Sequence, residues 1–185
     1  MKITQIRINP TLIKRKVICD IINPIKLNET KLKDLNELIN SIYHHDEDTL
    51  IDPSLDRTSP EELSMLIEKR ELFIVELDGK IVASIHLQNV DKDTHKFGML
   101  VTHPDYRYKG IASKLISFCE NKAKENGSKY MSLDLLKPKE WTHEQKEYLE
   151  NWYQRIGYIK SSLNDFPIKE NLLTPCDFFE FIKIL

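Results

Sequence analysis

FGMLVTHPDYRYKGIASKLISFCENKAKENG, residues 97–127, is the stretch that decides the fold expected for the rest of the chain. It opens with a short apolar run from Phe97 to Val101 and passes through a polar turn. From Gly110 the apolar residues recur at helical spacing, and Gly127 suits the left-handed position that ends a helix. The stretch therefore predicts a strand, a turn and a helix in succession.

The turn before this helix has the chemistry of an anion site. The first backbone N–H groups of a helix lack internal partners and lie at the positive end of its dipole, so they bind phosphates. Gly110 and Ala112 allow close approach to the backbone, and Arg107 and Lys109 add positive charge. Such junctions are also common structural connections, and neither a GxGxxG dinucleotide fingerprint nor a P-loop is present.

Five residues give the turn a more specific reading. Val101, Pro104, Arg107, Gly110 and Ala112 keep every spacing of the signature of the GNAT superfamily of acyl-CoA-dependent N-acyltransferases, which the chain resembles over about residues 25–160. One departure is the tyrosine after the arginine, where glycine is frequent. The resemblance implies that acetyl-CoA is the acyl donor. The residues expected to bind it are Met99, Leu100, Val101, Arg107, Tyr108, Lys109, Gly110, Ile111, Ala112 and Ser113.

Length and composition restrict the class of protein. The 185 residues suit one domain, in which 1–24 is an N-terminal extension and 25–160 the motif-bearing core. With 27 basic and 29 acidic residues and no basic block, we expect no nucleic-acid partner. No apolar run reaches the length of a membrane span, and the first residues lack a secretory pattern, so no membrane partner is expected either.

The cysteines and histidines indicate the redox state of the compartment and whether a metal site is expected. Three widely spaced cysteines, Cys19, Cys119 and Cys176, fit reduced thiols in a cytoplasmic protein better than a disulfide scaffold. His44 and His45 are adjacent, but neither a cysteine pair nor an HExxH motif accompanies them. We therefore expect no metal site.

Patterns before the central stretch predict two helices and a hairpin. Apolar alternation between Ile3 and Ile25 suggests one or two strands. Thr30 is the expected N-cap of a helix over 31–43, and a second helix starts at Ser59-Pro60. The acidic segment 44–56 between them is read as a loop that either attracts a cationic amine or is merely solvated. Strands 72–77 and 80–90 flank Asp78-Gly79, a hairpin turn, and in the second strand Ile81, Ala83, Ile85 and Leu87 are expected on one face.

Patterns after the central helix complete the fold class. A buried strand over 130–136 follows at crossover length and should lie parallel to 97–101. A helix ending at Gly157, a strand over 158–162 and an apolar strand over 177–185 come next, and the last is read as an inner strand or a dimer contact. The expectation is an α/β (α+β) domain with a mixed, mostly antiparallel sheet and helices on both faces. The resemblance further implies that the two parallel strands splay apart around the CoA arm.

Four side chains are candidates for the chemistry. His86 and Glu76, on the hairpin strands, could accept an amine proton, or be ordinary polar residues of a sheet face. Asp134 could contact the amine or face solvent. Trp152–Tyr158, WYQRIGY, resembles a GNAT segment whose tyrosine protonates the departing thiolate, which assigns that role to Tyr153; the other reading is a core aromatic.

The predicted function follows from this resemblance. We expect an N-acetyltransferase that moves an acetyl group from acetyl-CoA to a primary amine acceptor by direct attack in a ternary complex. The alternative is a non-catalytic acyl-CoA-binding or regulatory module, which shares the phosphate loop but needs neither Tyr153 nor a base. A homodimer is compatible with the sequence.

Overall fold

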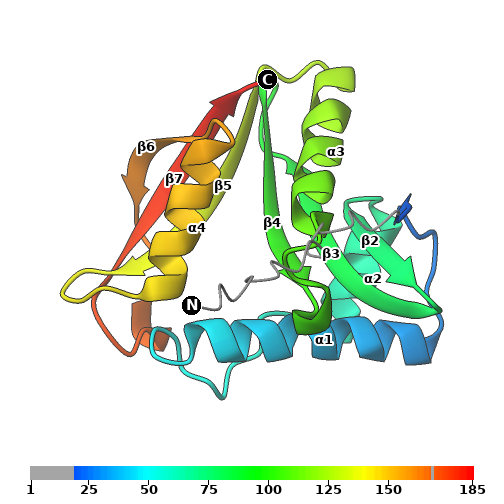
Figure 1. Ribbon diagram of the computed structural model, residues 1–185, viewed down its shortest axis with the longest axis horizontal. Helices are drawn as coiled ribbons and strands as arrows, with labels where there is room; N and C mark the ends of the chain where they lie inside the picture. The colour runs from blue at the N-terminus through cyan, green and yellow to red at the C-terminus, as the bar shows by residue number, and fades with distance from the viewer. Residues whose placement is uncertain (1–18, 168) are drawn as a thin grey trace, which may run out of the picture.

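The computed structural model describes residues 19–167 and 169–185, which form a seven-stranded sheet with helices on both faces (Figure 1). The strand order is β1-β2-β3-β4-β5-β7-β6, and every neighbouring pair is antiparallel except β4 and β5. The mixed, mostly antiparallel sheet predicted from the sequence is confirmed. The strands are β1 Ile21–Ile22, β2 Leu72–Leu77, β3 Lys80–Asn89, β4 Thr94–Thr102, β5 Tyr130–Pro138, β6 Ile159–Asn164 and β7 Cys176–Ile184.

The N-terminal predictions are tested only in part. The alternation expected between Ile3 and Val17, and most of the expected extension 1–24, lie outside the described residues. Within the described part, Ile21 and Ile22 form the short edge strand β1, which pairs with β2.

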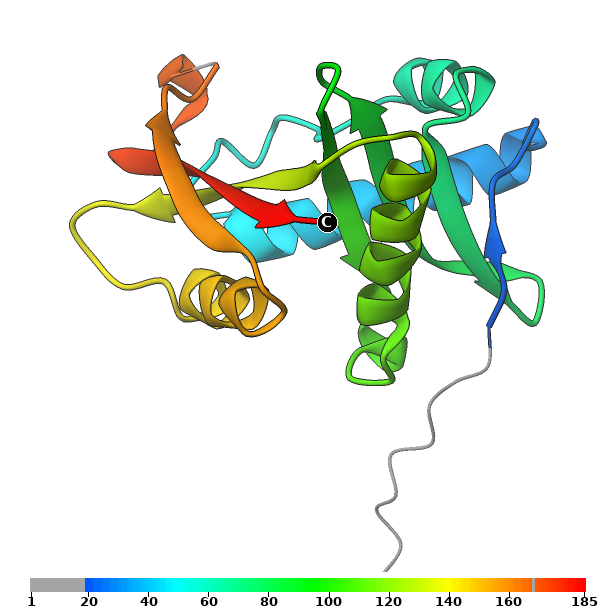
Figure 2. The ribbon, with the colours of Figure 1, turned by 90° about the horizontal axis from the view of Figure 1, so that it is seen from above.

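Two apolar clusters on opposite sides of the sheet explain why helices cover both faces. α3 (Ile111–Glu125) and α4 (Glu144–Arg155) pack on one face, where Leu115 and Cys119 are fully buried. α1 (Glu29–Glu47) and α2 (Pro60–Glu68) pack on the other face. Figure 2 shows the sheet between α1 on one side and α3 and α4 on the other. Residues of α1 and α2 that are buried in this second cluster include Leu35, Leu38, Ile39, Ile42, Leu63, Leu66 and Ile67.

The hairpin and the second helix form as the local sequence predicts. Asp78 and Gly79 have φ of 50° and 79°, the left-handed values that a two-residue turn between twisted strands requires. Ser59 caps α2, because its side chain accepts a hydrogen bond from the Glu62 N–H at 3.2 Å and Pro60 occupies the first turn.

Three local predictions need correction. The N-cap of α1 is Asn28, whose side chain accepts from the Lys31 N–H at 2.9 Å, so Thr30 lies inside the helix. α1 also continues to Glu47, four residues into the segment read as a loop, and so brings Asp46 beside Arg107 and Glu47 beside Lys146. In β3 an irregularity of the β2 pairing places Ile81 in the α1 and α2 cluster, whereas Ala83 and the residues alternating with it face α3.

The C-terminal third of the chain builds the far half of the sheet. β7 lies between β5 and β6, which confirms the reading of the apolar terminus as an inner strand. The segment before it contains the short 3₁₀ helix η2 (Lys169–Asn171). This segment pairs with the loop after α1, where Leu173 N–H donates to Leu50 C=O at 2.9 Å and Asp52 N–H donates to Asn171 C=O at 3.0 Å.

The part of the chain that the structure describes contains no helix long and apolar enough to span a membrane. In the same residues no three His, Cys, Asp or Glu side chains come together as a metal site.

Candidate active site

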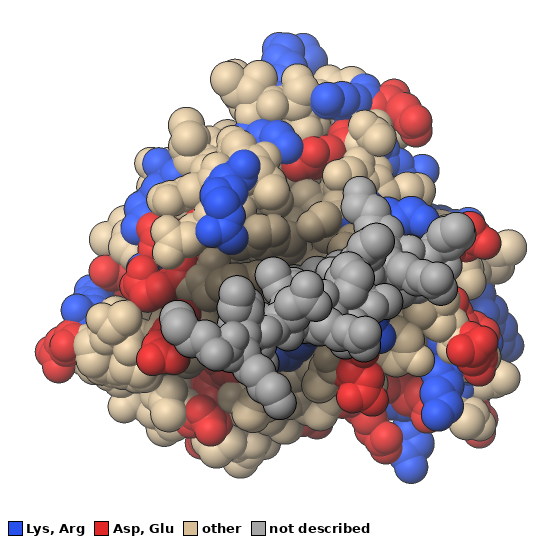
Figure 3. All heavy atoms as spheres, in the orientation of Figure 1, with Lys and Arg blue, Asp and Glu red and all other residues tan. Residues whose placement is uncertain are grey.

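A cleft of about 770 Å³ opens where β4 and β5 separate. The two strands pair only from Thr94–Tyr130 to Lys96–Ser132 and then diverge, as Figure 1 shows. Residues 96–102 of β4 and residues 133–136 of β5 line the cleft. Its rim, part of which is visible in Figure 3, carries charges of both signs rather than one basic patch.

The N-terminus of α3 forms one end of the cleft. Gly110 is the N-cap with φ 84°, in the left-handed region, and no side chain caps the helix. The first intrahelical bond runs from Lys114 N–H to Gly110 C=O at 3.0 Å, so the N–H groups of Ile111, Ala112 and Ser113 have no acceptor within the helix. Gly110 and these three residues line the cleft. An uncapped helix start with small residues fits a phosphate group.

The charged residues of the loop before α3 are used differently from what the sequence suggested. The Arg107 guanidinium lies 3.2 Å from the Asp46 carboxylate, and its backbone N–H donates to Pro104 C=O at 3.1 Å. Lys109 Nζ lies 4.7 Å from the centre of the Tyr106 ring and does not line the cleft. Tyr108, with φ 62°, does line it. Arg107 is therefore already paired with a carboxylate in this structure.

A bulge in β4 turns the backbone toward the cleft. Ser84 pairs with Val101 and His86 with Gly98, so β4 carries one extra residue, and Met99 has φ 43°. Phe97 consequently packs on the α3 face, whereas Met99 and Val101 pack on the α1 face. The Met99 backbone N–H lies beside the Tyr43 hydroxyl, where it lowers the Tyr43 pKa against the larger, raising effect of burial. The bulge therefore brings the Met99 backbone close to the Tyr43 side chain at the wall of the cleft.

His86 is the predicted base that the structure places in the cleft. It lies opposite Gly98, next to the β4 bulge, and its Nε2 is 3.4 Å from Glu71 Oε2. Burial lowers the pKa of His86, and the Glu71 carboxylate opposes that shift. The imidazole is thus neutral near pH 7, and a Nε2–H donated to Glu71 leaves Nδ1 as a proton acceptor.

Glu76, the other predicted base, is not part of the cleft lining. Its carboxylate lies 2.5 Å from Lys31 Nζ, which joins β2 to the start of α1. Asp134 does line the cleft, but it too is paired, at 2.9 Å from Lys96 Nζ.

Tyr153 lies on α4 at the opposite wall and is 7% exposed. Its ring contacts those of Phe97, Trp152, Tyr158 and Phe181, with centroids 5.2–6.5 Å apart. Burial raises the pKa of Tyr153, so the phenol keeps its proton over the whole physiological range. The phenol is therefore protonated before any reaction, and burial makes it a weaker acid than an exposed tyrosine.

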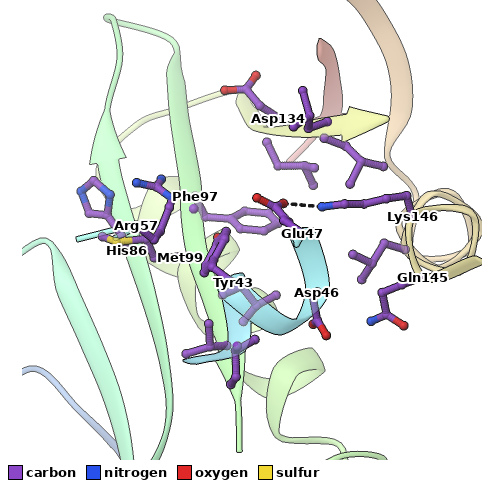
Figure 4. A pocket seen from close by; sticks show the side chains of 18 of the residues that line it. Tyr43, Asp46, Glu47, Arg57, His86, Phe97, Met99, Asp134, Gln145 and Lys146 are labelled. Carbon is purple, nitrogen blue, oxygen red and sulfur yellow. Dashed lines mark hydrogen bonds and ion pairs between the residues drawn. The ribbon is translucent and has the colours of Figure 1, made fainter. Parts of the chain in front are cut away.

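Sequence reasoning missed the residues that α1 and the following loop bring to the cleft. Tyr43 belongs to the apolar stripe of α1, yet its hydroxyl points to the β4 bulge. Arg57 lies over the Tyr43 ring, 5.3 Å from the guanidinium carbon to the ring centre. Figure 4 shows both near His86 and Met99, while Glu47 and Lys146 form an ion pair between α1 and α4. The signal in the sequence that could have indicated Tyr43 as a cleft residue is its position as a tyrosine at the end of an otherwise aliphatic stripe.

The sequence matches the family model described as "Acetyltransferase (GNAT) domain" over residues 68–160, half of the chain. This match includes β2–β5, α3 and α4. Comparison with curated proteins found no match.

Solved structures share the fold. The PaiA N-acetyltransferase of Thermoplasma acidophilum, in complex with coenzyme A, superposes with a TM-score of 0.69 at 16% identity, covering 91% of this chain and 100% of that one. A GNAT-family acetyltransferase of Staphylococcus aureus Mu50 superposes with a TM-score of 0.65 at 18% identity, covering 91% of this chain and 99% of that one.

A third similar structure is larger than this chain. N-acetylglutamate synthase of Neisseria gonorrhoeae, complexed with coenzyme A and N-acetyl-glutamate, gives a TM-score of 0.64 at 16% identity over 92% of this chain. The chain spans only 36% of that protein's length. On the family match, the fold and the divergent β4–β5 pair, the chain belongs to the GNAT acetyltransferase family.

Proposed function

We propose that this protein transfers the acetyl group of acetyl-CoA to a primary amine by direct attack in a ternary complex. The observation that carries the proposal is the cleft itself. It connects the uncapped start of α3 to the β4 bulge and to His86 and Tyr153 within one continuous space. The coenzyme A complexes of two similar structures support the choice of donor.

Donor binding is assigned to the backbone of two elements. The N–H groups of Ile111, Ala112 and Ser113 would hold the diphosphate, with Gly110 allowing close approach and Arg107, Tyr108 and Lys109 flanking it. The diverging β4, through Met99, Leu100 and Val101, would hold the pantetheine arm. The Met99 N–H, which already points at a polar group, is suited to stabilise the oxyanion of the thioester carbonyl.

Proton transfer is assigned to His86 and Tyr153. As the acceptor nitrogen bonds to the acetyl carbon and the carbon–sulfur bond breaks, His86 Nδ1 takes the amine proton and the Tyr153 hydroxyl gives a proton to sulfur. Glu71 keeps the His86 ring in the required tautomer. We no longer assign Glu76 a role in the chemistry, because it is held by Lys31 away from the cleft lining.

The remaining assignments concern the whole chain. We propose one acyltransferase domain over residues 1–185. Among the described residues Cys19, Cys119 and Cys176 are free thiols, which supports a reducing, cytoplasmic location.

Two measurements on the purified protein test the proposal. Calorimetry should show CoA binding, and thiol release from acetyl-CoA should require a primary amine. Tyr153→Phe should lower kcat by about 100-fold while leaving CoA affinity within a factor of about two, because the phenol acts on the leaving sulfur. If the protein bound CoA but released no thiol from acetyl-CoA with any amine, the non-catalytic module would be favoured. If the folded protein did not bind CoA, both readings would be refuted.

A further inference from the structure

The cationic side chains that line the cleft differ in whether a carboxylate pairs with them. Among residues 19–167 and 169–185, the Lys and Arg side chains that line it are Arg57, Lys96, Arg107 and Lys146. Three of them are neutralised by a carboxylate: Lys96 by Asp134 at 2.9 Å, Arg107 by Asp46 at 3.2 Å, and Lys146 by Glu47. Within the described residues Arg57 has no carboxylate within ion-pair distance.

Arg57 also lies beside His86, where the amine of an acceptor substrate would bind. Its guanidinium is positioned over the Tyr43 ring, and it is close enough to His86 to lower the pKa of that imidazole. Figure 4 shows Arg57, Tyr43, His86 and Met99 as one group on the β4 side of the cleft. An anion bound to Arg57 would therefore lie within a few bonds of an amine presented to His86.

We infer that the acceptor is an amino acid or a similar small molecule with both a primary amine and a carboxylate, and that Arg57 binds the carboxylate. This inference rests on the proposed acetyl transfer. A planar guanidinium donates two parallel hydrogen bonds to a carboxylate, which fixes the direction of the acceptor as well as its charge. Its position over the Tyr43 ring, 5.3 Å from the guanidinium carbon to the ring centre, adds a cation–π contact that favours this placement of the side chain.

The acidic side chains around Arg57 have partners other than its guanidinium. Asp52 accepts from the Ser54 N–H at 2.9 Å, and Asp56 lies 3.3 Å from His44 Nε2. Glu62 accepts from the Thr58 hydroxyl at 2.9 Å. These contacts hold the loop that carries Arg57 against α1 and α2, whereas the Arg57 charge is left for a ligand.

The test compares acceptors that differ only in the carboxylate. Thiol release from acetyl-CoA is measured with glycine, alanine, β-alanine, γ-aminobutyrate and glutamate, each beside its primary carboxamide, and with spermidine. We expect kcat/KM for the best acid to exceed that for its amide by at least about tenfold. Arg57→Gln should lower kcat/KM for acids by about 10- to 100-fold, mainly through KM, and change that for amides by no more than about threefold.

Arg155→Gln is the matched control, because Arg155 is an exposed arginine on α4 that does not line the cleft. It should keep the preference for acids, and CoA affinity should be equal in both variants and the wild type. Amides or spermidine acetylated as well as the acids, or a preference that survives in Arg57→Gln, would overturn the inference and leave the transfer intact. If the protein bound CoA but released no thiol from acetyl-CoA with any of the amines, the proposed transfer would be overturned, and this inference with it.

Discussion

Residues Glu71 and His86 illustrate how two neighbouring side chains set a proton acceptor. The pairing of Leu72 with His86 in the β2–β3 ladder puts Glu71 beside the imidazole. Burial of His86 disfavours its charged form and lowers its pKa, while the Glu71 carboxylate favours that form. The effect of burial is the larger, so the pKa is lowered and the ring stays neutral down to a pH below the ordinary histidine value.

Glu71→Gln tests this balance. Glutamine keeps an oxygen that can accept from Nε2–H but removes the charge, so the pKa of His86 should fall further. The acid limb of kcat, measured at saturating acceptor so that it reports the enzyme–substrate complex, should move to lower pH. We expect kcat at pH 7 to fall by no more than about tenfold, and His86→Gln to lose this limb. An acid limb at the wild-type pH in Glu71→Gln would show that His86 is not the titrating group.

At the scale of one element, a single substitution at the start of α3 can separate the stability of the helix from the proposed binding of CoA. Negative charge in the first turn of a helix stabilises the helix, because it interacts with the positive end of the dipole. The same charge repels a diphosphate bound to the first N–H groups. Ser113 is an exposed residue of this first turn, and Ser117 is exposed one turn further on.

Ser113→Asp should therefore weaken CoA binding without weakening the fold. We expect the CoA dissociation constant, measured by calorimetry, to rise by at least about tenfold, while the free energy of unfolding stays within about 0.5 kcal/mol or increases. Ser117→Asp is the matched control and should change the dissociation constant by no more than about twofold. If both variants bound CoA as the wild type does, the diphosphate would not lie at this helix start.

At the scale of the whole molecule, one ion pair joins elements that are far apart in the chain. Glu47 ends α1 and Lys146 lies in the first turn of α4, 99 residues later. Their side chains are 14% and 5% exposed, so each charge depends on the other for compensation. The pair links the two walls of the cleft (Figure 4).

Removing one partner of the Glu47–Lys146 pair should lower the free energy of unfolding more than removing both. Glu47→Gln leaves a buried ammonium uncompensated and should lower the free energy of unfolding by about 3 kcal/mol. The double variant Glu47→Gln and Lys146→Met should recover at least about half of that loss, because no isolated buried charge remains. Urea unfolding followed by tryptophan fluorescence measures both values. Equal losses in the single and double variants would show that the pair contributes packing rather than charge compensation.

Local patterns predicted the elements well because their causes are local. The spaced Val101, Pro104, Arg107, Gly110 and Ala112, the Asp78-Gly79 turn and the Ser59 cap each specify backbone geometry through neighbouring residues. Errors arose where two local signals competed. Asn28 and Thr30 are both residue types that cap helices well, and the helix begins after Asn28.

The sequence by itself determined the order of the elements, the start of α3 at Gly110 and the family, because these depend on spacing along the chain. Only the tertiary structure decided which candidates share a cleft. Strand pairing placed Glu71 behind His86, Lys31 drew Glu76 away, and the β4 bulge turned the Met99 backbone toward Tyr43. Such partnerships form between residues distant in the chain, and folding brings them together through burial, register and charge, none of which is a property of a local pattern.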